Sequence, residues 1–205
     1  MEDPNDSNSR DFLSRAGIAL ADVLGHSDAR HAVAVSDHVL RHLAEIKNNA
    51  TFRRYESQAL VGSSYSLRRL GRSVEAHERL TAAIERLGEL KLYPADRITL
   101  GSEVDYALRA LADDEADNGN LSRAIDIYQD LLRRILAAKP KPEDSLADAT
   151  RLSDLYASAA ALNQRFGKAD VASALDTRRM ALWQHWARQL PDNPFVLRQV
   201  SATVH

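Results

Sequence analysis

The sequence contains no cysteine, only 8 glycines and 6 prolines among 205 residues, and few aromatic side chains. The lack of cysteine excludes disulfides, thiolate metal sites and cysteine nucleophiles within this chain. Lysine plus arginine (27) and aspartate plus glutamate (29) nearly balance, whereas a general nucleic-acid binder is strongly basic. No apolar run approaches the length of a membrane span, and the acidic, polar start is unlike a signal peptide. We therefore expect neither nucleic-acid binding nor direct membrane insertion.

What the sequence does contain is a helical pattern of apolar residues. Apolar residues make up 44% of the chain, and they recur at intervals of three and four, as in Leu80, Ala83 and Leu87. No alternating run bounded by turn residues indicates a strand. We therefore predict an all-α fold. The predicted helices span residues 10–24, 28–47, 51–70, 73–92, 95–117, 121–138, 144–166 and 169–190, followed by a short segment at 193–205.

Regularly spaced glycines divide these helices into repeats. Gly71, Gly119 and Gly167 are 48 residues apart in both intervals, and Gly25 lies 46 residues before Gly71. Each follows a predicted helix, where a left-handed C-cap needs a residue without a Cβ. We therefore predict that the chain turns at these four glycines.

A small residue follows each turn. Ala76, Ala124 and Ala172 each come five residues after a repeat glycine, whereas Ala32 follows Gly25 by seven, which predicts a two-residue insertion in the first turn. Small side chains let two antiparallel helices approach closely. A fixed period with two helices in it is typical of a helical repeat array.

The small residue in the first helix, the turn glycine and the alanine in the second helix resemble the tetratricopeptide repeat, most closely at residues 117–132. The resemblance implies an α-solenoid of about four antiparallel hairpins with a C-terminal cap or tail at 191–205. Residues 1–9 are expected to be disordered or a linker from a preceding repeat. A period of 48 exceeds the roughly 34 residues of that family, which implies longer helices and leaves the curvature open. The hairpins are expected at about 10–47, 51–92, 95–138 and 144–190.

Both ends of the chain carry a narrower resemblance. "MALWQHWARQLPDNPFVLRQV" at 180–200 looks like the closing segment of tetratricopeptide regions in some bacterial serine/threonine protein kinases, and "EDPNDSNSRDFLSRAGIALADVLG" at 2–25 looks like a junction between their repeats. The resemblance implies a parent protein that continues upstream of Met1. No glycine-rich nucleotide loop, HRD or DFG motif lies in this chain, so kinase activity would belong to sequence outside it. The expected compartment is the cytoplasm, or outside it if the parent spans a membrane.

Histidines form the one candidate for metal binding. His31, His38 and His42 lie on one stripe of the second predicted helix, and Glu45 lies a further turn along it. Two imidazoles four residues apart can chelate a divalent cation, but the glutamate of zinc proteases is missing after His38. His38 and His42 are therefore a weak metal candidate beside the default of a solvated or end-packed histidine face. No cofactor is expected.

Three further patterns have structural interpretations. "VGSSYS" at 61–66 lacks the second glycine of a nucleophile elbow and lies in a predicted helix, so its serines are interpreted as packing residues. The acidic run at 113–115 is interpreted as a solvated helix face rather than an acid–base pair. Trp183 and Trp186 are expected to pack the last hairpin against 195–200 rather than to stack on a ligand. We predict no catalytic residue.

Two classes of function remain open at this point. The favoured one is a non-catalytic scaffold that binds proteins or peptides, as the sensor or recruitment region of a larger bacterial signalling protein such as a serine/threonine kinase. The alternative is a free-standing all-helical enzyme or ligand-binding protein. An enzyme would need a nucleophile, a base and an electrostatic stabiliser that these residues do not assemble.

In tetratricopeptide arrays the first helix of each hairpin lines the concave side, which implies where a partner would bind. Arginine and tyrosine in this strip suit an acidic peptide, unless the arginines only pair with neighbouring carboxylates. The first hairpin could also drive homodimerisation through an uncovered apolar face that includes Phe12, Ile18 and Leu20. The implied groove residues are Arg15, Tyr65, Arg68, Arg69, Tyr106, Arg109, Asp113, Gln164 and Arg165.

Overall fold

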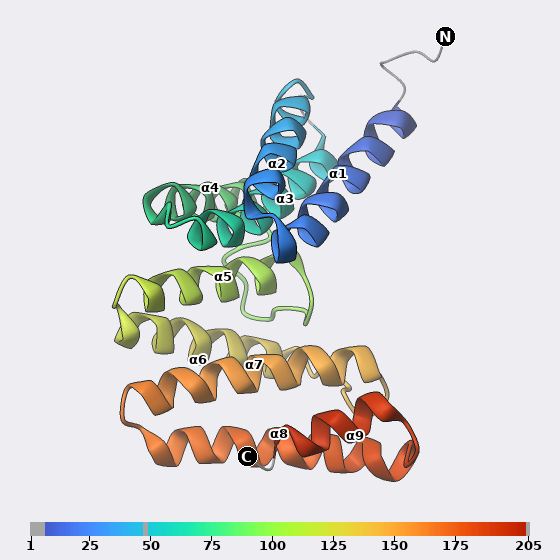
Figure 1. Ribbon diagram of the computed structural model, residues 1–205, viewed down its shortest axis with the longest axis vertical. Coiled ribbons are helices and arrows are strands. Elements are labelled where there is room, and N and C mark those ends of the chain that lie inside the picture. The colour runs from blue at the N-terminus through green and yellow to red at the C-terminus, as the bar shows by residue number, and fades with distance from the viewer. Residues whose placement is uncertain (1–6, 47–48, 204–205) are drawn as a thin grey trace. The chain divides into compact units, whose positions relative to one another are not determined.

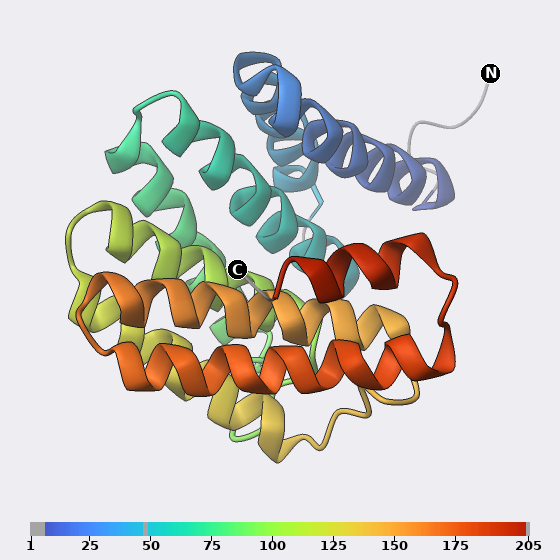
Figure 2. The ribbon, with the colours of Figure 1, turned by 60° about the horizontal axis from the view of Figure 1, so that its bottom comes forward.

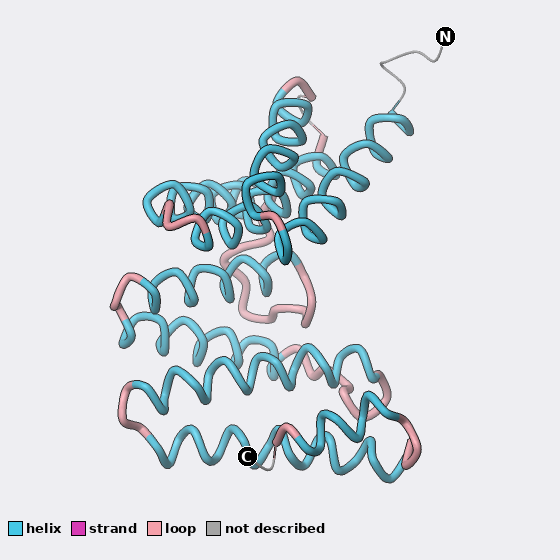
Figure 3. Tube along the Cα trace, viewed as in Figure 1, coloured by secondary structure: helices cyan, strands magenta, loops and turns pink. Residues whose placement is uncertain are grey.

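The computed structural model describes residues 7–46 and 49–203, and within these ranges every regular element is a helix (Figure 3). The prediction of an all-α fold is confirmed. Residues 7–9 already belong to the first helix, and 1–6 lie outside the described ranges. None of the described helices combines the length and apolarity that a membrane span needs. The helices are α1 (Ser7–Ser27), α2 (Ala29–Ala44), α3 (Ala50–Arg69), α4 (Ser73–Glu89), α5 (Glu103–Asp117), α6 (Leu121–Ala137), α7 (Leu146–Arg165), α8 (Ala169–Gln189) and α9 (Pro194–Ser201).

The chain divides into two compact units. Unit 1 takes in the chain up to Ala95 together with Tyr106–Asp114, and unit 2 takes in Asp96–Asp105 and the chain from Glu115 onward. In unit 1, α1 packs on α2 and α3, and α3 packs on α4 (Figure 1). In unit 2, α7 packs on α6 and α8, and α9 folds back along α8 (Figure 2).

A buried alanine recurs near the start of every second helix. Ala32, Ala76, Ala124 and Ala172 are each the fourth residue of their helix, and all four are buried. Extra methylenes at a buried, well-packed position displace the neighbouring atoms, so a small side chain suits such a position. The alanine positions that the sequence spacing singled out are therefore packing positions.

Three of the four predicted glycine turns are confirmed. Gly71, Gly119 and Gly167 have φ values of 73°, 85° and 83°, in the left-handed region where glycine is favoured. After each of them the backbone N–H of the next residue donates to the carbonyl five residues earlier, at 2.8–3.0 Å. This is the bond that closes a Schellman C-cap.

The predicted turn at Gly25 is wrong. The helix α1 continues through Gly25 to Ser27, and the chain turns at Asp28, whose carboxylate accepts a hydrogen bond from the His31 backbone N–H at 3.0 Å. A Cβ at Gly25 would lie 3.3 Å from Ser66 Oγ of α3, so glycine serves close packing here. The apparent insertion before Ala32 is therefore a longer helix, not a longer loop.

The predicted helix at 95–117 begins only at Glu103. Gly101 has a φ of 77°, and its N–H donates to Asp105 Oδ2 at 2.8 Å. A Cβ at Gly101 would also meet Arg151 Nε at 2.8 Å. A right-handed helix cannot pass through a residue with a left-handed backbone, so α5 begins only after Gly101.

Trp183 packs against the 195–200 segment of unit 2 as predicted, whereas the hydrogen bond of Trp186 goes to the loop before α7. Trp183 is fully buried, its Nε1 donates to Ser153 Oγ of α7 at 2.7 Å, and its ring meets Phe195 of α9 edge-on at 5.8 Å. Trp186 Nε1 donates to the Pro142 carbonyl at 2.9 Å. One indole therefore joins α7, α8 and α9.

Candidate interaction site

A polar cluster joins α3 to the 106–114 part of α5 in unit 1. The Tyr65 hydroxyl donates to Asp113 Oδ2 at 3.3 Å, and Arg68 Nη2 donates to the Asp113 carbonyl at 3.2 Å. The Arg68 guanidinium also lies over the Tyr65 ring, 5.4 Å from its centroid. The structure thus brings together three residues that the resemblance had implied for the groove.

The electrostatics of Tyr65 show what surrounds its hydroxyl. Burial of the hydroxyl and the nearby Asp113 carboxylate raise the pKa of Tyr65, and the positive charges of Arg68 and Arg109 act in the opposite direction. Arg109 lies near enough for its charge to act on this hydroxyl. Tyr65 still has 38% of its surface exposed and Tyr106 has 47% exposed, so both rings are open to a partner.

The other predicted groove residues lie apart from these contacts. Arg69 is exposed at the end of α3. Arg15 lies on α1, where its guanidinium pairs with Asp11 at 3.6 Å. Gln164 and Arg165 are exposed on α7 and belong to unit 2. Arg15 thus pairs within its own helix and Arg68 bonds to a backbone carbonyl, and both the nine-residue groove and the alternative of pairing with carboxylates on neighbouring helices stay predictions.

The interpretation of the acidic run as a solvated face is wrong for two of its three members. Asp114 and Glu115 are buried. Asp114 Oδ2 lies 2.8 Å from His77 Nδ1, and Glu115 Oε1 lies 2.9 Å from Arg123 Nε. Buried carboxylates require such partners. His77 is 37 positions away from Asp114, so no local pattern in the sequence could have indicated the pair.

The His77–Asp114 pair has the geometry in which a carboxylate orients an imidazole. The His77 side chain is half exposed, and the Asp114 side chain is almost fully buried. The same arrangement positions the histidine of a catalytic triad, but catalysis also requires a nucleophile and a stabiliser of developing charge. We interpret the pair as a link between α4 and α5.

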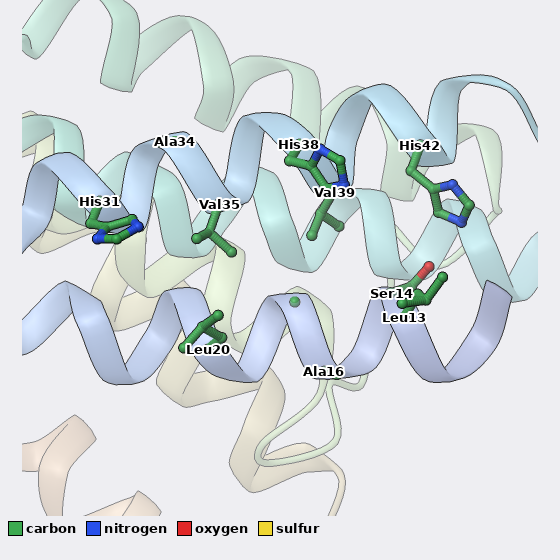
Figure 4. Close-up of a pocket in the computed structure, with 11 residues that line it drawn as sticks. Leu13, Ser14, Ala16, Leu20, His31, Ala34, Val35, His38, Val39 and His42 are labelled. Carbon is green, nitrogen blue, oxygen red and sulfur yellow. The ribbon is translucent and has the colours of Figure 1, made fainter. Parts of the chain in front are cut away.

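A groove with a volume of about 490 Å³ runs between α1 and α2 in unit 1. Apolar side chains of both helices line it, and His31, His38 and His42 follow its α2 side (Figure 4). Nε2 of His42 is buried without a hydrogen-bond partner. The histidine stripe that the spacing predicted therefore faces this groove.

The same histidines were the weak metal candidate. Within residues 7–46 and 49–203, no group of three or more histidine, cysteine, aspartate or glutamate residues is placed to hold a metal ion. His38 and His42 could contribute two ligands, fewer than the three or four protein ligands of zinc sites. The structure thus adds no further ligand to the pair.

Comparisons with known proteins identify the fold alone. No family model matches the chain, and no curated protein matches it. Among solved structures, BtubC (BKLC) from P. vanneervenii is similar, with a TM-score of 0.63 and 17% sequence identity over 91% of this chain and 75% of the BtubC chain. At this identity the likeness supports a shared helical architecture and carries no function. The resemblance to kinase-associated tetratricopeptide regions stays a prediction.

Proposed function

We propose that this chain is a non-catalytic protein-interaction module that binds an extended acidic peptide across α3 and residues 106–114 of α5. In this proposal the helices form a solenoid of about four tetratricopeptide-like hairpins. Three Schellman turns and four buried alanines at equivalent helix positions support a repeat architecture. The parent protein is proposed to be a bacterial signalling protein such as a serine/threonine kinase, with this region as its sensor or recruitment part.

The observation that carries the binding proposal is the open Tyr–Arg surface of unit 1. Tyr65 and Tyr106 are partly exposed, Arg68 bonds to the Asp113 carbonyl beside them, and the charge of Arg109 also acts on the Tyr65 hydroxyl. Guanidinium groups bind carboxylates in two-point contacts, and tyrosine adds contact area at a low entropic cost.

Two features favour binding by a surface that is already formed. The contacts of Arg68 with the Asp113 carbonyl and the Tyr65 ring hold these side chains in place, so less ordering is required when a partner binds. One turn before Tyr65, a Cβ at the exposed Gly62 would meet no atom within 4 Å. A peptide backbone can therefore approach α3 closely at this point.

The test compares binding of a fluorescein-labelled poly-glutamate peptide and a length-matched poly-lysine peptide by fluorescence polarisation. The variant combines Arg109→Glu with Tyr106→Ser, because both residues belong to the Tyr–Arg surface and neither side chain is buried. Arg68 is left intact, since its bond to Asp113 contributes to the packing of α3 on α5. Arg30→Glu, which changes an exposed arginine on α2, is the control.

The wild type and the Arg30→Glu control should bind poly-glutamate alike, and added salt should weaken this binding. The double variant should bind at least about tenfold more weakly. Equal binding of both peptides, or unchanged affinity in the double variant, would contradict the proposal.

A further inference from the structure

The outer face of α1 exposes a continuous apolar stripe. Phe12 is 71% exposed, Leu13 58%, Leu20 51% and Val23 67%. They follow one another at helical spacing, so they form a single strip, and no charged residue interrupts it. Ile18, by contrast, is half buried and packs on the core formed by Val39 and its neighbours. Scattered apolar residues are normal on a protein surface, but a contiguous strip marks an interaction site.

The groove between α1 and α2 continues this stripe. Leu13 and Leu20 belong to both, and none of the groove-lining residues is an aspartate, glutamate, lysine or arginine. Figure 4 shows Leu20 of α1 pointing toward α2, with the three histidines along the opposite side. The chemistry of the groove therefore fits an apolar helix face better than a charged peptide.

We propose that a second copy of this chain covers the groove, with α1 of each copy lying in the α1–α2 groove of the other. A twofold interface must be self-complementary, so that the same surface both covers and is covered. Leu13 and Leu20 meet this condition because they line the groove and also belong to the stripe that would enter it. At 1.5 Å per residue, the 21 residues of α1 extend about 30 Å and exceed the roughly 17 Å between His31 and His42.

The exposed apolar area of α1 limits how tightly two copies can associate. The four exposed side chains present roughly 400 Å² of apolar surface per copy, and the groove walls add to it. A standard interface buries about 800 Å² per partner, so this one lies at or below that size. We expect a reversible dimer that dissociates on dilution through the low-micromolar range.

Sedimentation velocity between about 1 and 100 µM tests this dimer, a range chosen for micromolar dissociation. The decisive variant is Val23→Glu, and the matched control is Val74→Glu on α4. The two valines are 67% and 74% exposed, so neither substitution removes a core contact. The wild type and Val74→Glu should shift from monomer to dimer with the same midpoint. In Val23→Glu the midpoint should rise at least about tenfold, with unchanged circular dichroism.

A single cysteine gives an independent readout. Because the natural chain has none, Ala19→Cys can form a disulfide only between two copies. Ala19 lies on the stripe and is exposed, so oxidation should cross-link this variant, and adding Val23→Glu should suppress the cross-link. If the wild type stays monomeric at the highest concentration, the proposal is wrong and the groove binds another partner. A dimer that persists in Val23→Glu would place the interface elsewhere and overturn it as well.

Discussion

Replacing Trp183 with phenylalanine tests the packing of unit 2 in quantitative terms. The indole is fully buried, and its Nε1 donates to Ser153 Oγ at 2.7 Å. Phenylalanine would lose that hydrogen bond, which contributes about 1 kcal/mol. It would also leave a void where the second ring lay, and transfer and cavity effects of this size amount to about 1–2 kcal/mol. We therefore expect a loss of about 2–3 kcal/mol in the free energy of unfolding of unit 2.

The measurement is urea denaturation followed by tryptophan fluorescence and by circular dichroism. Both tryptophans lie on α8, so fluorescence reports on unit 2, whereas circular dichroism reports on all helices. Trp186→Phe is the comparison, because Trp186 is only partly buried and donates one hydrogen bond to the Pro142 carbonyl. Trp186→Phe should lower the free energy of unfolding by less than Trp183→Phe does, by about 1 kcal/mol.

A double-mutant cycle with Ser153→Ala isolates the hydrogen bond. Trp183 and Ser153 are in direct contact, so their effects should not add, and the coupling should be about 1 kcal/mol. Arg179 Nε also donates to Ser153 Oγ, at 3.2 Å, so part of the Ser153→Ala effect belongs to that bond. A cost below about 0.5 kcal/mol for Trp183→Phe, or a greater cost for Trp186→Phe, would refute the assignment of Trp183 as the central packing residue.

Two further predictions concern α6 and the polar cluster. Ala124→Leu should overpack a fully buried position and cost about 1–3 kcal/mol in urea denaturation, and unchanged stability would show that Ala124 is not a packing position. Burial and the Asp113 carboxylate raise the pKa of Tyr65, so its phenol should stay protonated above pH 10 in ultraviolet titrations. Because the pKa is higher in the folded state, the stability that Tyr65 contributes is present below pH 10 and is lost as the pH rises through the folded pKa. Tyr65→Phe should therefore lose less stability than the wild type above pH 10, and equal losses would contradict the assigned cause.

The features that the sequence predicted depend on local chemistry. Turns at Gly71, Gly119 and Gly167 follow from the one residue that enters the left-handed region freely, and the backbone bonds around them are made within a few residues. The buried alanines were predictable for a similar reason, because each is the fourth residue of its helix and so lies at a fixed distance from the preceding turn. The failure at Gly25 shows the limit, because that glycine accommodates Ser66 of α3, which no local pattern encodes.

The parts that sequence reasoning missed depend on residues far apart in the chain. The start of α5 is set by Gly101, whose place against Arg151 of α7 is known only once the chain is folded. The burial of Asp114 depends likewise on His77. Within the candidate site, Tyr65, Arg68 and Asp113 were selected through a family resemblance, and the contacts that join them appear only in the folded structure.

The close approach of α1 and α2 has a consequence for how this protein can change over evolutionary time. A Cβ at Gly17 would overlap with the side chain of Val39, which is itself part of the buried core of unit 1. A mutation at either position alone is constrained, because a larger residue at 17 needs a smaller one at 39. In an alignment of related sequences, positions 17 and 39 should therefore covary, and residues larger than glycine at 17 should occur together with alanine or glycine at 39.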